Sequence, residues 1–422
     1  MQEQHIRYAT GIDVGTTMVR CVVGYLDETT ATPNIIGVGT APNVGMRKGV
    51  VVNIPSTAQA IDRALEEAER MSGHQIHTAA MNINGSHIAA ISSRGVVAVG
   101  TGGSGISEED LARAEEAATV VQLPANREIL QVTPRGYQLD GQENIKDPLG
   151  MQGVRLEVDA HVITALTPHV KNLLKSANTT ETVPKRLVVS VLAAARAVVQ
   201  PQQMENGVAV IDLGGATTNI AVFEEGDLQH VAVLPIGSVN ITNDLAIGLR
   251  TDLDIAENIK LQHASAIAPS SDDEAKDITV TANGEKLTFT TKDVAMIVEA
   301  RLDEIFELID KELRRIDRSG KLPGGVILTG GGAKLKGVAE YAKEKLALPV
   351  RVAKMNSLTG IVDKVASPEY ATAVGLMLLD LEQENRDNSG SKTMQHKAVQ
   401  SGTKVVHNFM QQANSLFKKF KT

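Results

Sequence analysis

Two short stretches, IDVGTT at residues 12–17 and IDLGGATT at residues 211–218, indicate the fold of this chain. Each follows an apolar run and carries an aspartate, then glycine, then threonine hydroxyls. Glycine lets the backbone approach a ligand closely, and successive N–H groups in such a turn form a site for an anion. Two strand–turn–strand hairpins of this kind that face each other are suited to hold a polyphosphate from both sides.

A third turn, TGGGA at residues 329–333, also follows an apolar strand and precedes an expected helix, which suits a backbone approach to a nucleoside. Either hairpin alone is explained equally well as a tight turn, but the three turns together favour a nucleotide site. Asp13 and Asp212 are expected to hold water around Mg²⁺, which keeps much of its hydration shell in proteins. The residues of these turns that are expected to bind the nucleotide are Asp13, Gly15, Thr16, Thr17, Met18, Asp212, Gly214, Gly215, Ala216, Thr217, Thr218, Gly330, Gly331, Gly332 and Leu335.

Glu257 and Lys260 lie on an expected helix over residues 251–264, and their spacing places them on one face of it. An ordinary exposed ion pair is the commoner reason for this spacing. The alternative is that the two side chains contact the ribose and adenine of a bound nucleotide. That alternative depends on the fold and not on the spacing.

The turns alternate with insertions in an order typical of the actin and heat-shock-chaperone ATPase superfamily. The chain has neither a Walker GxxxxGK[ST] motif nor a GxGxxG motif between a first strand and its helix. The sequence therefore predicts an α/β, actin-like fold with two mixed-sheet lobes around a nucleotide cleft. The superfamily includes sugar kinases, chaperones and filament proteins, so the fold alone does not define the function.

The remaining elements follow from hydrophobic spacing and turn residues. Helices are expected over residues 56–71, from about Ser107, over 291–316 and over 369–381. Strands are expected at residues 81–83, 87–92, 96–99 and 187–192, with a hairpin at 278–290 that turns at Asn283-Gly284. Residues 79–163 are predicted to form an inserted domain, and the polar residues 385–403 a linker.

Composition narrows the class of protein. At 422 residues the chain is too long for one core, and its net charge of −8 argues against a broad nucleic-acid-binding surface. Cys21 is the only cysteine, which excludes an intramolecular disulfide and fits a reducing cytosol. The N-terminus has no signal-peptide core, and the longest apolar stretch, 187–199, is shorter than the ~20 residues of a transmembrane helix. Any membrane contact is therefore expected to be peripheral.

The C-terminal segment, residues 404–422, is predicted to be an amphipathic helix. Its apolar residues follow one another at gaps of one or three positions, which places them on one helical face, and it contains four lysines and no acid. A final helix packed on the core is the alternative, but the polar stretch before it favours an interfacial helix on an anionic membrane. The residues expected to contact the membrane are Val405, Val406, Phe409, Met410, Leu416, Phe417, Lys418, Lys419 and Phe420.

Several stretches carry a resemblance to a known family, and most of them lie in the insertion. They are SHI at 86–88, SRGVVA at 93–98, REIL at 127–130, DGQ at 140–142, IKDPLGM at 145–151 and GVRLEV at 153–158. Others are MRKGVVVN at 46–53, IGS at 236–238 and ITNDLA at 241–246. On these residues the chain resembles the FtsA family of bacterial division proteins, from about residue 8 to 382 and again in the tail.

This resemblance implies an actin-like fold without the usual subdomain 1B. A differently placed subdomain, called 1C in that family, would take part in filament contacts instead. The implied subdomains are 1A at residues 1–78, 164–205 and 367–384, 1C at 79–163, 2A at 206–246 and 317–366, and 2B at 247–316. The linker at 385–403 and the membrane helix at 404–422 would follow.

The resemblance also implies a function. Proteins of this kind bind ATP with Mg²⁺, polymerise with themselves on the cytoplasmic face of the membrane at the division septum, and recruit FtsZ. The C-terminal peptide of FtsZ would dock on subdomain 2B, where Arg301 matches a basic position of the family. A solvated charge paired with a neighbouring acid is an equally good explanation of Arg301.

Three positions depart from the family pattern. Met18 stands where the family often has lysine, Ala216 replaces a glycine, and Asn219 replaces an aspartate. These changes predict ATP binding with slow or absent hydrolysis. Two other functions remain open. One is a PilM-like pilus-assembly adaptor, which the GATTN run at 215–219 favours, and the other is a small-molecule kinase of the same superfamily.

Overall fold

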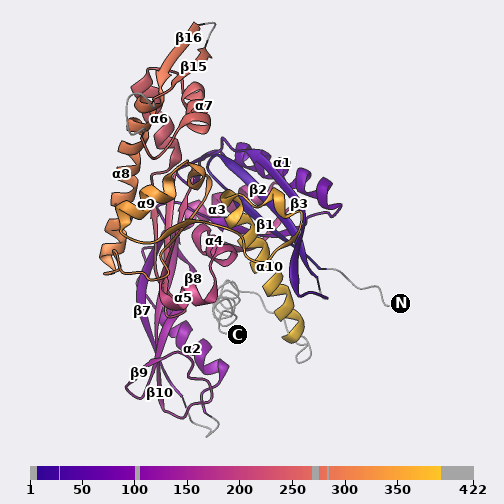
Figure 1. The fold of residues 1–422 in the computed structure, drawn as a ribbon. Coiled ribbons are helices and arrows are strands. Elements are labelled where there is room, and N and C mark those ends of the chain that lie inside the picture. The colour runs from indigo at the N-terminus through magenta and orange to yellow at the C-terminus, as the bar shows by residue number, and fades with distance from the viewer. Residues whose placement is uncertain (1–6, 28, 100–104, 269–274, 283–284, 391–422) are drawn as a thin grey trace.

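The computed structural model describes residues 7–390 except 28, 100–104, 269–274 and 283–284. It consists of two lobes, each built on its own sheet, and a third sheet inserted into the first lobe (Figure 1). The first lobe has a six-stranded sheet of order β11-β6-β1-β2-β3-β19. Its strands are β1 (Tyr8–Val14), β2 (Met18–Asp27), β3 (Thr32–Pro42), β6 (Thr78–Ile83), β11 (Val183–Val189) and β19 (Thr359–Gly360).

The first predicted hairpin is formed by β1 and β2, and the Gly15 N–H donates to the Met18 carbonyl oxygen at 3.0 Å across its turn. After β3 comes a small hairpin of β4 (Met46–Arg47) and β5 (Val50–Val51). Helix α1 (Ile54–Ser72) then packs its apolar face against β3. It begins after an Asn53 cap and ends at Gly73, whose φ of 67° suits glycine.

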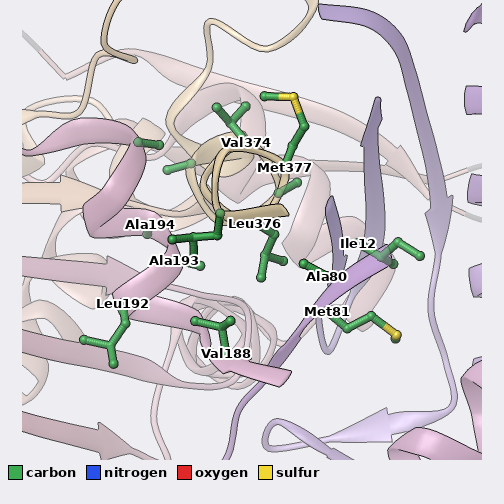
Figure 2. Packing of buried hydrophobic residues seen from close by; sticks show 14 of the residues in the cluster. Ile12, Ala80, Met81, Val188, Leu192, Ala193, Ala194, Val374, Leu376 and Met377 are labelled. Atoms are coloured by element: carbon green, nitrogen blue, oxygen red, sulfur yellow. The ribbon is translucent and has the colours of Figure 1, made fainter. Parts of the chain in front are cut away.

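Two helices bury the face of this sheet that lies toward the second lobe. They are α4 (Ser190–Val198) and α10 (Ala371–Gly390), and Figure 2 shows Val374 and Leu376 of α10 beside Ala193 of α4. The two backbones are so close that a Cβ added at Gly375 would meet the Ala193 carbonyl oxygen at 1.7 Å. Glycine at this position lets α10 close the lobe against α4 and β1.

The second lobe has a five-stranded sheet of order β14-β13-β12-β17-β18. Its strands are β12 (Val208–Leu213), β13 (Thr218–Glu224), β14 (Asp227–Leu234), β17 (Val326–Thr329) and β18 (Val350–Val352). Its helices are α5 (Pro201–Asn206), α6 (Ser238–Leu249), α7 (Leu253–His263), α8 (Thr291–Arg315) and α9 (Val338–Leu346), with the short 3₁₀ helix η2 (Gly331–Lys334). Two further 3₁₀ helices, η3 (Val362–Lys364) and η4 (Pro368–Tyr370), follow β19, and Ile361, Val365 and Tyr370 pack with the core of the first lobe. The predicted hairpin is β15 (Asp277–Ala282) and β16 (Glu285–Thr290), and its expected turn lies outside the described residues.

The inserted sheet has the order β7-β10-β8-β9, is covered by α2, and lies at the opposite end of the molecule from β15 and β16 (Figure 1). Its elements are β7 (Ala89–Ala98), α2 (Glu108–Ala118), β8 (Arg127–Leu139), β9 (Gln142–Ile145) and β10 (Arg155–Leu166), and α3 (Thr167–Asn178) returns the chain to the first lobe. Ser107 caps α2 as expected. The insertion contacts the second lobe, where Lys146 Nζ lies 2.5 Å from Asp227 Oδ2.

Four local expectations need correction. Strand β6 was expected within the insertion, but it pairs with β1 and β11 in the first sheet because its apolar side chains are buried there on both faces. The pieces at 87–92 and 96–99 form one continuous strand, β7. Residues 190–192 begin α4 and do not extend the strand before them. The linker expected from residue 385 overlaps α10, which continues to Gly390.

The predicted helices at 56–71, 251–264 and 291–316 are confirmed within two residues at each end, and the helix predicted at 369–381 is present but continues to Gly390. The predicted membrane helix, residues 404–422, lies outside the described residues. Among the described helices, none is both long enough and apolar enough to cross a bilayer.

Candidate functional site

A cavity of about 960 Å³ lies between the two lobes, and the three predicted turns converge on it. The first hairpin, the second hairpin, the glycine turn after β17 and helix α7 all contribute to its wall. The predicted residues that line it are Asp13, Gly15, Thr16, Thr17, Met18, Asp212, Gly214, Gly215, Thr217, Glu257, Lys260, Gly330, Gly331, Gly332 and Leu335. Residues that are far apart in the sequence therefore form one site.

Two predicted residues, Ala216 and Thr218, are not part of the cavity wall. The Thr218 side chain is fully buried, and its hydroxyl donates to the Ile236 carbonyl oxygen at 2.9 Å. Thr217 lines the cavity and accepts a hydrogen bond from Asn84 Nδ2 of the first lobe at 3.0 Å. Thr217 lies in the turn just before β13 and Thr218 is the first residue of that strand, and only Thr217 of the two reaches the cleft.

The glycine turn after β17 packs directly on the second hairpin. Gly330 has a φ of 82°, and a Cβ there would lie 2.3 Å from Asp212 Oδ1 and 2.6 Å from the Leu213 carbonyl oxygen. Gly331 has no neighbouring atom within 4 Å of its Cβ position. Only the first of these two glycines is therefore required by the packing of the protein itself.

The two aspartates are electrostatically unusual. Removal of water by the surrounding protein raises the pKa of Asp13 to about 7, against the opposing positive charge of Arg20 and with a further increase from the charge of Asp212. Burial raises the pKa of Asp212 to about 6, against hydrogen bonding from Asn219 and the charge of Arg20. Two carboxylates that are costly to ionise together are suited to a bound cation.

Oxygen donors of this kind fit Mg²⁺. The ion prefers carboxylate, hydroxyl and water oxygens and usually combines one or two protein carboxylates with phosphate oxygens of a ligand. Asp13 and Asp212 line the same cavity from opposite lobes, and the hydroxyls of Thr16 and Thr17 lie in the same wall. The residues present therefore match a hydrated magnesium ion bound together with a polyphosphate.

Arg20 is a cavity residue that the sequence argument missed. It lies two positions after Met18 on β2, so both side chains face the cavity. Its guanidinium carbon lies 5.5 Å from the centre of the Tyr370 ring. Strand alternation from Met18 was a signal that could have identified it. The cleft therefore has a cationic side chain two residues after Met18, the position at which the family often has lysine.

The predicted pair on α7 forms part of the wall. Lys260 Nζ lies 2.6 Å from Glu257 Oε2 and donates to Thr242 Oγ1 at 2.8 Å, and its side chain is only 9% exposed. The lysine is thus largely buried, whereas the Glu257 side chain is 40% exposed. Both residues line the cavity.

Arg301 lies on α8 and is held by two acids. Its Nη2 donates to Asp244 Oδ1 at 2.8 Å, its Nε to Asp244 Oδ2 at 2.5 Å, and it also bonds Glu304. The local ion-pair explanation is thus present in the structure. A role in binding a peptide stays a prediction.

Comparisons of sequence give consistent results along the chain. The family model described as "Cell division protein FtsA" matches residues 209–375, and the one described as "SHS2 domain inserted in FTSA" matches residues 85–164. Cell division protein FtsA of Bacillus subtilis (strain 168) is 40% identical over 367 residues, which cover 87% of this chain and 82% of that protein. The same protein of Pseudomonas aeruginosa is 38% identical over 379 residues, which cover 89% of each chain.

Comparisons of structure show the fold. The PilM-PilN type IV pilus biogenesis complex contains a chain that matches with a TM-score of 0.65 and 18% identity, covering 89% of this chain and 98% of that one. MreB5 of Spiroplasma citri bound to ADP matches with a TM-score of 0.56 and 12% identity, covering 91% and 99%. The predicted actin-like fold is confirmed. At these identities the similarity extends to the fold alone.

Proposed function

This chain belongs to the FtsA family of cell division proteins, and from that premise we propose that it binds ATP with Mg²⁺ in the cleft. We propose further that it assembles with other copies of itself on the cytoplasmic face of the cell membrane. There, at the division septum, it tethers FtsZ filaments to the membrane. The observation that supports the proposal most directly is the convergence of three glycine turns and two opposed carboxylates on one cavity between the lobes.

Each part of the cavity has a role in the proposed complex. N–H groups and hydroxyls of the two hairpins, including Thr16 and Thr217, donate to the phosphates, and Arg20 offsets their charge. Asp13 and Asp212 hold the water shell of Mg²⁺, which neutralises phosphate charge when bound. Glu257 and Lys260 contact the ribose and base. We propose slow or absent turnover, on the basis of Met18 and of the neutral Asn219 beside Asp212.

The membrane part of the proposal rests on the sequence of residues 404–422. An amphipathic helix with lysines on its polar face binds an anionic surface reversibly, at ~1 kcal/mol per lysine near the headgroups. Many copies in one filament bind together far more firmly than one copy does. Self-assembly and membrane attachment therefore support each other in this proposal.

Co-sedimentation with anionic vesicles and ATP tests the membrane function. Full-length protein is expected to sediment with the vesicles and to carry FtsZ with it, and protein that ends at residue 403 is expected to do neither. The test variant carries a first pair of substitutions, Phe409→Ser with Phe417→Ser, on the apolar face. The matched control carries a second pair, Asn408→Ser with Gln412→Ser, on the polar face. Only the first pair should release the protein. Equal sedimentation of both pairs, or of the truncated chain, would refute the membrane anchor.

A further inference from the structure

Asn82 is a polar residue in an otherwise apolar central strand, β6, whose sequence is TAAMNI. Its side chain is 2% exposed, and it lies behind the wall of the large cavity without lining it. Burying an amide costs free energy unless its donors and acceptor are hydrogen-bonded. The partners of Asn82 therefore indicate why the strand contains it.

Both donors and the acceptor oxygen of the Asn82 amide are engaged by residues around the site. Its Oδ1 accepts from the Val14 N–H at 2.6 Å. Its Nδ2 donates to Asp13 Oδ1 at 2.6 Å and to Ser190 Oγ at 3.0 Å. The backbone N–H can only donate, so it fixes which end of the amide faces Asp13.

The topology brings these residues together. β6 lies between β1 and β11, and it is parallel to both, with Ile12 opposite Met81 and Val188 opposite Asn82. One step further along β1 comes Asp13, and Ser190 follows the end of β11. Asn82 therefore joins the carboxyl ends of three adjacent strands at the floor of the cleft.

We propose that Asn82 is a positioning residue for metal binding. It holds one oxygen of Asp13, Oδ1, and so directs the other, Oδ2, towards the water shell of the magnesium ion that accompanies a nucleotide. Among the described residues no hydrogen bond reaches Asp13 Oδ2, and Asp13 lines the cavity. This inference rests on the nucleotide site proposed above. It adds a residue that does not touch the ligand and acts through Asp13.

The second lobe contains a counterpart built from different elements. Asn219 Nδ2 donates to Asp212 Oδ2 at 3.0 Å, and Asn219 is also fully buried and outside the cavity wall. Each of the two opposed carboxylates thus has one buried amide behind it. The recurrence supports a role in orienting the carboxylates, because the two amides come from unrelated strands.

The test compares metal affinity with nucleotide affinity in Asn82→Ala. A fluorescent ATP analogue is titrated into the full-length protein in EDTA, and Mg²⁺ is then titrated at saturating nucleotide. We expect the Mg²⁺ concentration for half-maximal effect to rise by about 10- to 100-fold, the range for residues that orient metal ligands. Binding in EDTA should stay within about twofold, because an orienting role does not involve the nucleotide directly.

A double-mutant cycle with Asp13→Asn separates an orienting role from a general structural one. In the Asp13→Asn background, Asn82→Ala should have no further effect on the Mg²⁺ requirement. Equal losses in both backgrounds, or an unchanged requirement in Asn82→Ala, would overturn the inference. Asn82→Leu has a similar shape, carries no charge and cannot donate to Asp13, and it serves if the alanine variant fails to fold. Wild-type protein that ignored nucleotide altogether would refute the site itself and this inference with it.

Discussion

The hairpin turns of the two lobes have nearly the same sequence, yet the protein supports their aspartates differently. Asp13 is held by Asn82, which lies 69 residues away on a neighbouring parallel strand. Asp212 is held by Asn219, only 7 residues away on the other strand of its own hairpin. The first hairpin also carries Arg20, and the second is packed under Gly330. Similar local motifs can therefore obtain the same geometry from local or from distant parts of a chain.

The comparison extends to charge. The pKa of Asp13 is raised to about 7 and that of Asp212 to about 6, in both cases chiefly because the protein removes water from the carboxyl. A hydrogen bond from Asn219 is one of the effects that limits the increase at Asp212. Both carboxylates are therefore costly to ionise when no cation is bound.

The largest expected effect is on the stability of the protein without metal or nucleotide. A carboxyl whose pKa is higher in the folded protein than in the unfolded chain lowers the free energy of unfolding as the pH rises above the unfolded-state pKa. The loss of stability is complete above the folded-state pKa. At pH 8 we expect Asp13→Asn to stabilise the protein by as much as about 4 kcal/mol, and Asp212→Asn by as much as about 3 kcal/mol. Chemical denaturation in EDTA measures both.

At pH 4 the same substitutions should have little effect on stability, because the carboxyls are then protonated in the folded protein and close to their unfolded pKa. Binding of Mg²⁺ with ATP should be weakened in both variants but still measurable at high Mg²⁺ concentration. A wild-type protein that became more stable between pH 4 and pH 8 relative to Asp13→Asn would contradict the assigned electrostatics.

The second effect concerns the packing of the glycine turn on the second hairpin. Gly330→Ala should destabilise the protein by about 2 to 3 kcal/mol, because its Cβ meets Asp212 Oδ1 and its φ is positive. Gly331→Ala, one position along, is the matched control and should change stability by less than about 0.5 kcal/mol. Thermal unfolding of the two variants measures the difference. Equal losses of stability in both would disprove that the packing of the second lobe requires glycine at position 330.

The smallest effect separates two adjacent threonines. Thr218→Val removes the hydroxyl that donates to the Ile236 carbonyl, so it should cost about 1 kcal/mol of stability and leave nucleotide affinity unchanged. Thr217→Val removes a hydroxyl in the cavity wall, so it should weaken nucleotide binding several-fold. Binding and denaturation measurements on both variants test the assignment of faces. Weaker nucleotide binding in the Thr218 variant would reverse it.

The level of sequence identity separates the two candidate families. Identity of 38–40% with FtsA proteins over most of the chain contrasts with 18% for the PilM-PilN complex, although the folds agree. The run GATTN, which favoured a PilM-like adaptor, forms the turn between β12 and β13. Stretches in the insertion, such as IKDPLGM, favoured the FtsA family in the sequence, and the family model of the domain inserted in FtsA matches residues 85–164.

The sequence by itself determined the three turns, the two-lobed fold and the family. Glycines, aspartates and hydroxyls at strand ends have consequences for the backbone that are local, and local chemistry can be read along the chain. Most residues of the proposed nucleotide site followed from those turns. Only the tertiary structure decided that Asn82 belongs with Asp13, that Thr218 faces away, and that β6 joins the first sheet. Hydrogen-bond partners on neighbouring strands are set by the order and register of the sheet, and no pattern within a single strand specifies them.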